Sequence, residues 1–132
     1  MQGSLDTNAL LRLLLCDIQE QHNAVEALLA QTKKQLAVAD IAIIELVFVL
    51  NRYYEFSRIE VEEAVIGLMQ LAQISCNRTI FEKALYLYVH YPALSFEDCC
   101  LAAYASLNKA DPLWTFDKKL SVQVSNAKLI EL

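Results

Sequence analysis

Glycine and proline are scarce in this 132-residue chain, with two of each. That scarcity argues against collagen-like, low-complexity and disordered classes, and no glycine- or proline-rich linker divides the chain. Hydrophobic residues make up 56% of the composition, which favours a helix-rich globular protein. The length suits one domain, residues 1–132, that is large enough to bury a core.

The four cysteines lack the spacing of a metal-binding or disulfide framework. No C-x-x-C pair occurs, and Cys99 and Cys100 are adjacent within an apolar run. No zinc site is therefore readable from Cys16, Cys76 or this pair. We expect buried reduced thiols, which are typical of a cytoplasmic protein.

Long hydrophobic runs are also absent. The longest, Ile41 to Leu50, is too short to span a bilayer and contains Glu45. The first residues show no charged-then-apolar leader, although Met1 to Ser4 is polar for a first strand. We expect a soluble, cytoplasmic protein without a membrane partner.

Basic residues are outnumbered by acidic ones, 11 against 16, and the formal net charge is -5. Such a balance is unfavourable for non-specific binding to nucleic acid, which depends on Lys and Arg neutralising phosphates. RNA could still bind through a local basic patch or through metal ions held by carboxylates. If RNA binds through such a patch, the candidate contact residues are Arg12, Lys118 and Lys119.

Helical and extended patterns alternate along the chain. Ser57 with Glu60, and Ser95 with Asp98, have the spacing of capping boxes at helix starts, and Asp40 is a candidate helix cap. Short strands between helices predict a parallel sheet with helices on both faces, and hence an α/β fold. Helices are predicted near residues 8–16, 23–32, 41–52, 57–71, 78–89 and 99–107, and strands near 36–39, 74–76, 113–116 and 128–132.

Four acids occupy positions that suggest a site. Asp6 and Asp117 are each the first acid after a predicted strand, and ligands of open parallel sheets bind beyond the carboxyl ends of the strands. Glu45 has no polar neighbour within a helical turn, so its carboxylate must be paired, protonated or bound to a metal. Each acid also has a simpler interpretation: a helix cap for Asp6, a narrow exposed strip for Glu45, a capping box for Asp98, and a surface ion pair for Asp117.

These acids and their neighbours resemble a known family. The segments are Asp6-Thr7-Asn8 followed by Leu10-Leu11-Arg12, Glu45 in its apolar helix, Phe96-Glu97-Asp98, and Thr115-Phe116-Asp117. Together they resemble the acidic pattern of PIN-domain ribonucleases, and look most like the VapC-type toxins of type II toxin–antitoxin pairs. The resemblance covers nearly the whole chain.

The resemblance implies a three-layer α/β fold with a short parallel sheet, at whose carboxyl end four acids hold Mg²⁺ or Mn²⁺. Asn8 and Thr115 match polar positions that orient ligands or waters, whereas Ser95 stands where many relatives have a further acid. The metal-site acids would be Asp6, Glu45, Asp98 and Asp117.

The implied activity is metal-dependent cleavage of single-stranded or loop RNA. Mg²⁺ or Mn²⁺ can neutralise the phosphate and activate a water, so neither His22 nor His90 is needed as a base. The resemblance also implies a homodimer and a cognate antitoxin, and the apolar runs Ile41–Leu50 and Tyr86–Tyr91 suggest partner surfaces.

Two other functions stay open. A catalytically silent PIN-like module would bind a protein partner without turnover. Another Mg²⁺-dependent α/β phosphohydrolase, such as a phosphatase with an aspartate nucleophile, would need a second acid two residues after Asp6. Asn8 stands there instead.

Overall fold

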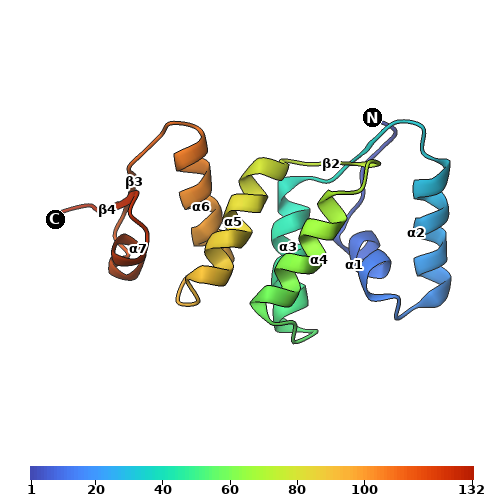
Figure 1. The fold of residues 1–132 in the computed structure, drawn as a ribbon, viewed down its shortest axis with the longest axis horizontal. Coiled ribbons are helices and arrows are strands. Elements are labelled where there is room, and N and C mark those ends of the chain that lie inside the picture. The colour runs from blue at the N-terminus through green and yellow to red at the C-terminus, as the bar shows by residue number, and fades with distance from the viewer. The chain divides into compact units, whose positions relative to one another are not determined.

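The computed structural model describes residues 1–132, which form two compact units, Met1–Asn77 and Arg78–Leu132 (Figure 1). Seven helices alternate with short strands, and the strands pair in parallel within each unit. The predicted α/β class is confirmed. That the chain forms a single domain stays a prediction.

The first unit begins with a polar segment that pairs with a later strand through an isolated bridge. Ser4 forms a parallel bridge with Ala37, and the Leu5 amide donates to the Ala37 carbonyl at 2.9 Å. Strand β1 (Leu36–Ala37) then pairs in parallel with β2 (Ile74–Ser75). Asp6 therefore follows directly on a paired segment, as its sequence position predicted.

Four helices accompany these strands, and in Figure 1 they extend to one side of them. Helix α1 packs against α2 and α3, and α3 packs against α4. Their bounds are α1 Thr7–Leu15, α2 Gln19–Gln31, α3 Asp40–Arg52 and α4 Arg58–Met69. The fully buried side chains of this core include Leu10, Ile43, Leu46, Leu50, Val61, Val65, Leu68 and Ile74.

Helix α3 is apolar almost throughout but is buried on one face only. Ile43, Leu46 and Leu50 recur at helical spacing and have no exposed surface. On the other face Ile41 and Phe48 are 65% and 52% exposed, and Glu45 is exposed between them. Glu45 therefore lies on an exposed strip of α3, as its simpler interpretation predicted.

The second unit is built on two packed helices, α5 (Arg78–His90) and α6 (Phe96–Leu107). Phe96 stacks on Phe81 with ring centroids 6.3 Å apart, and meets Tyr88 edge-on at 5.4 Å. Strands β3 (Leu113–Thr115) and β4 (Ala127–Leu129) pair in parallel, joined through α7 (Lys118–Gln123). Helix α7 packs against both strands.

Several local predictions were wrong. Helix α7 was not predicted, and the last strand covers Ala127–Leu129 instead of residues 128–132. Asp40 does not cap α3, because it is the first residue of the helix, and the N-cap residue Ala39 offers no side-chain acceptor.

The expectation of buried thiols holds for Cys99, whereas Cys16 is exposed and the other two are half-buried. None of the four cysteines takes part in a disulfide. Cys16 is the C-cap residue of α1, where the chain leaves the helix in the left-handed conformation. No helix is long and apolar enough to cross a membrane.

Candidate functional site

Asp6 starts helix α1 and also faces a cavity. Its Oδ1 accepts a hydrogen bond from the Ala9 backbone amide at 2.9 Å, which satisfies one of the amides left unpaired at a helix start. This bond uses one carboxylate oxygen, and Oδ2 is left for another ligand. The helix-cap interpretation of Asp6 is therefore confirmed without excluding a metal role.

The cavity beside Asp6 has a volume of about 590 Å³. Side chains of α1, of α3 and of the segment that follows α3 form its wall, so two acids that are far apart in the sequence share one space. The lining residues are Asp6, Thr7, Asn8, Leu11, Arg12, Glu45, Val49, Tyr53 and Tyr54.

Glu45 has the partner that its own helix lacks. Thr7 Oγ1 donates a hydrogen bond to Glu45 Oε1 at 2.7 Å, across from α1 to α3. A short hydroxyl–carboxylate bond holds the charged side chain in a defined orientation. Thr7 was missed as a site residue, although it stands between Asp6 and Asn8 in the sequence segment that suggested the family.

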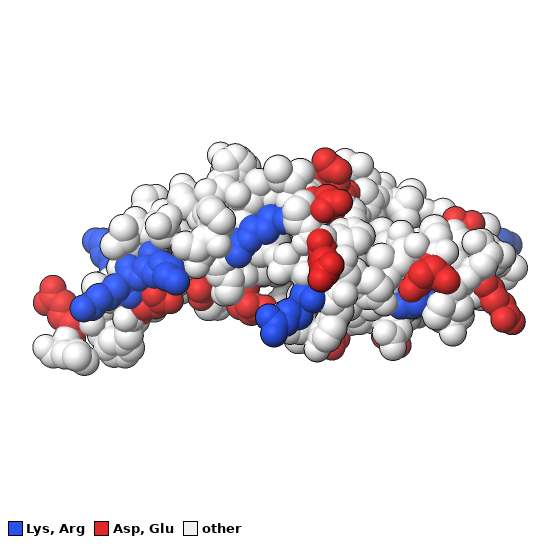
Figure 2. Space-filling view, turned by 90° about the horizontal axis from the view of Figure 1, so that it is seen from below, with Lys and Arg blue, Asp and Glu red and all other residues white.

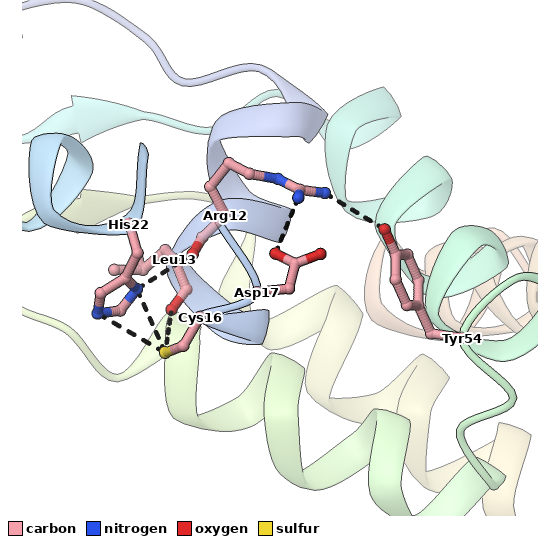
Figure 3. A network of polar contacts seen from close by, with 6 residues as sticks. All are labelled: Arg12, Leu13, Cys16, Asp17, His22 and Tyr54. Atoms are coloured by element: carbon pink, nitrogen blue, oxygen red, sulfur yellow. Dashed lines mark hydrogen bonds and ion pairs between the residues drawn. The ribbon is translucent and has the colours of Figure 1, made fainter. Parts of the chain in front are cut away.

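Arg12 is held by two side chains (Figure 3). Its Nη1 donates to Asp17 Oδ1 at 2.8 Å and its Nη2 donates to the Tyr54 hydroxyl at 3.3 Å. The bond to Tyr54 and then the charge of Asp17 raise the pKa of Arg12, against a lowering by burial. Arg12 lines the cavity, but its charge is already matched by Asp17. Its role in RNA contact stays a prediction.

In the second unit, Asp98 and Asp117 each stand at the start of a helix. Ser95 Oγ accepts from the Asp98 amide at 3.1 Å, so the serine half of the predicted capping box is formed. Asp117 caps α7, and its Oδ1 accepts from the amides of Lys119 at 2.9 Å and Leu120 at 3.2 Å. Asp98 therefore lies in the first turn of α6, and Asp117 is the N-cap residue of α7.

Thr115 acts on the turn between β3 and α7. Its Oγ1 accepts from the Asp117 amide at 2.9 Å, which sets the direction in which the chain enters the helix. Lys118 and Lys119 follow in the first turn of α7, and both are exposed. Thr115 thus lies beside Asp117, where the sequence segment placed it.

The structure brings Asp6, Asn8 and Glu45 together. It positions no group of three or more His, Cys, Asp or Glu side chains to hold a metal ion. That Asp98 and Asp117 belong to the same site stays a prediction.

Both histidines make contacts with neighbouring residues. His22 is buried, with Nδ1 3.1 Å from the Arg12 carbonyl and 3.3 Å from Cys16 Sγ (Figure 3). Its Nε2 lies 3.0 Å from Glu26 Oε1. His90 stacks on Tyr86 with ring centroids 4.0 Å apart.

The surface carries no broad basic region on the face in Figure 2. Lys and Arg side chains lie there among acidic and neutral residues. This distribution agrees with the excess of acidic residues in the whole chain.

Parallel strands followed by acids at helix starts define an α/β protein with a candidate divalent-metal site. The PIN domain matches residues 4–123, so the chain belongs to the PIN-domain family. PIN domains are generally nucleases that depend on a divalent metal ion. A search of curated proteins finds no match to this chain.

Proposed function

We propose that this protein is an endoribonuclease that depends on Mg²⁺ or Mn²⁺ and cleaves single-stranded or loop RNA in the cytoplasm. Within the family, the proposal makes it a VapC-type toxin of a type II toxin–antitoxin pair. The observation that carries the nuclease activity is the shared cavity of Asp6 and Glu45 in a chain that belongs to the PIN family.

The side chains of the cavity suit a hard divalent cation. Asp6, Asn8 and Glu45 offer oxygen atoms only, and oxygen ligands are what Mg²⁺ and Mn²⁺ prefer. Thr7 holds the Glu45 carboxylate by its Oε1, so Oε2 is left to meet a cation. A bound cation would neutralise the phosphate and activate a water for in-line attack.

The proposal assigns Asp98 and Asp117 to the same metal site, on the sequence pattern that they share with the family. Asn8 and Thr115 are proposed to orient ligands. Thr115 can do this through its hydrogen bond to the Asp117 amide, which positions the backbone of that acid.

RNA contact is proposed for Arg12, Lys118 and Lys119. Lys118 and Lys119 are exposed on α7, where their charges can approach a phosphate chain. Charge reversal by Lys118→Glu is expected to weaken binding of a single-stranded RNA. It should also flatten the salt dependence of binding, because a complex with fewer phosphate contacts releases fewer counterions when it forms. An unchanged salt slope would contradict this role.

The test is cleavage of a labelled single-stranded RNA and of a hairpin loop, with Mg²⁺, Mn²⁺ or chelator. Loss of a ligand should cost more than loss of an outer contact, so Glu45→Gln and Asp117→Asn are expected to lower the rate by roughly 100-fold or more. Glu63→Gln, an exposed acid on α4, is the matched control. Cleavage that survives these changes or resists chelator would contradict the proposal.

A parallel assay with a phosphomonoester separates the alternatives. Phosphatase activity without RNA cleavage would favour the other phosphohydrolase. No turnover of either substrate would favour the silent interaction module.

A homodimer and a cognate antitoxin are part of the proposal. Ile41 and Phe48 on α3, and Tyr86 on α5, expose apolar surface that a partner could cover. Sedimentation at micromolar concentration tests the dimer, and a strictly monomeric species would remove it. Co-expression with the protein encoded beside this chain tests the antitoxin, which should bind and suppress cleavage.

A further inference from the structure

Two exposed aromatic rings stand at the end of α3, at the edge of the acidic cavity. Tyr53 is 71% exposed and Phe48 is 52% exposed. Tyr53 lines the same cavity as Asp6 and Glu45. The aromatic surface is therefore continuous with the candidate metal site.

The two rings hold each other in a fixed arrangement. Their centroids are 6.0 Å apart and their planes meet at 79°, an edge-to-face contact. The Tyr53 amide also donates to the Val49 carbonyl at 2.9 Å, which anchors the backbone to the last turn of the helix. In an edge-to-face contact one ring presents its edge and the other a single face, so each ring keeps at least one face outside this contact. Because Tyr53 is 71% exposed, a flat ligand can stack on such a face.

The neighbouring Tyr54 is used differently. Its hydroxyl accepts from Arg12 Nη2, and it is 40% exposed (Figure 3). Tyr54 therefore helps to position Arg12, whereas the Tyr53 ring meets Phe48 edge to face and is 71% exposed.

The charge of the cavity wall determines whether RNA is attracted through its phosphates or through its bases. Asp6 and Glu45 are acidic, and the charge of Arg12 is matched by Asp17. Within this wall Arg12 is the one basic side chain that a phosphate can meet, so charge alone attracts a phosphate chain weakly there. Base stacking on an aromatic ring does not depend on charge, and every base has a face that can stack.

We propose that Tyr53, braced by Phe48, is a stacking platform that holds one base of single-stranded RNA beside the acidic cavity. The inference rests on the proposed function for its RNA substrate. It adds a residue that selects unpaired bases, because a base inside a duplex has no free face to stack.

The test measures binding of fluorescent ten-nucleotide oligoadenylate and oligouridylate by anisotropy, in chelator, where a metal-dependent nuclease does not cut. Tyr53→Leu keeps an apolar side chain and removes the ring, and it is expected to weaken oligoadenylate binding roughly tenfold. Tyr53→Phe and Tyr53→Trp are expected to bind like the wild type. Ile59→Ala, which alters a 57% exposed apolar residue on α4, is the control.

Salt dependence separates stacking from charge. The slope of log affinity against log salt is expected to be the same for Tyr53→Leu and the wild type, since no phosphate contact is lost. Oligoadenylate is expected to bind more tightly than oligouridylate, because a purine offers the larger stacking face.

The outcomes distinguish this inference from the proposed function. Wild-type binding by Tyr53→Leu, or no binding of either oligonucleotide by the wild type, would overturn the platform, even if cleavage still depends on Glu45. Loss of binding in Tyr53→Leu, with no metal-dependent cleavage by the wild type, would keep the platform and reject the nuclease. A switch from dimer to monomer in Tyr53→Leu, without change in RNA binding, would make Tyr53 part of a subunit interface and also overturn the platform.

Discussion

Asp6 has two roles that a substitution can separate. Its Oδ1 caps α1, and its carboxylate lies in the wall of the cavity that contains Glu45. Asparagine is about as good a helix cap as aspartate, but it carries no charge. Alanine neither caps the helix nor carries a charge.

We predict that Asp6→Asn removes metal-dependent cleavage while the protein stays folded. Asp6→Ala is expected to lower the free energy of unfolding by about 1 kcal/mol as well, because the Ala9 amide loses its acceptor. Urea unfolding and the RNA cleavage assay, run on both variants, check the two effects. Full cleavage by Asp6→Asn would reduce Asp6 to a helix cap.

Residue types near the site were predictable, but contacts between them were not. The sequence pattern identified Asp6, Asn8 and Glu45, which line one cavity. The bond from Thr7 to Glu45 was missed, because a hydroxyl next to an acid looks like an ordinary start of a helix. The ion pair of Arg12 with Asp17 was also missed, because it depends on where the chain turns after α1.

Thr7 is predicted to position Glu45. Thr7→Val keeps the shape of the side chain and removes the hydroxyl, so the Mg²⁺ concentration needed for half-maximal cleavage should rise roughly 10–100-fold. Thr7→Ser keeps the donor and is expected to restore the wild-type midpoint. Equal midpoints for Thr7→Val and the wild type would show that the 2.7 Å bond does not matter for the site.

At the scale of elements, helix starts were the most predictable features. Ser57 and Glu60 form the predicted capping box at α4, with both reciprocal hydrogen bonds present. Hydrogen bonds from Ser57, first from its backbone amide, hold the pKa of Glu60 below its ordinary value of 4.5. A lowered folded-state pKa stabilises the fold above the ordinary value, and that stabilisation is lost as the pH falls through the folded-state pKa.

Glu60→Ala is therefore expected to be less stable than the wild type at neutral pH, with a difference that shrinks as the pH falls below the ordinary pKa of 4.5. Urea unfolding at several pH values between 3 and 7 checks this. Glu63→Ala on the same helix controls for the loss of an acid outside the capping box. A difference as large at pH 3 as at pH 7 would contradict the assignment.

Short elements were the least predictable. Helix α7 spans six residues and buries only Leu120, so its sequence shows no helical repeat of apolar residues. Strands of two or three residues likewise show no alternation, and β4 was placed one residue late. The longer helices were predictable because their buried positions recur every three or four residues, as in α3.

At the scale of the whole molecule, the order of the acids along the chain predicted the family that residues 4–123 confirm. The acidic composition was a weak guide by comparison, because charge bears on binding and solubility and not on fold. What the sequence could not predict is the shape of the cavity, which depends on how α1, α3 and the residues after α3 pack.

The central claim is that Asp6 and Glu45 hold a divalent cation in their shared cavity. Calorimetric titration of the wild type with Mn²⁺ should show saturable binding that Asp6→Asn and Glu45→Gln each weaken at least tenfold and Glu63→Gln leaves unchanged. Equal Mn²⁺ affinity in all four proteins, or no binding by the wild type at millimolar metal, would contradict the claim.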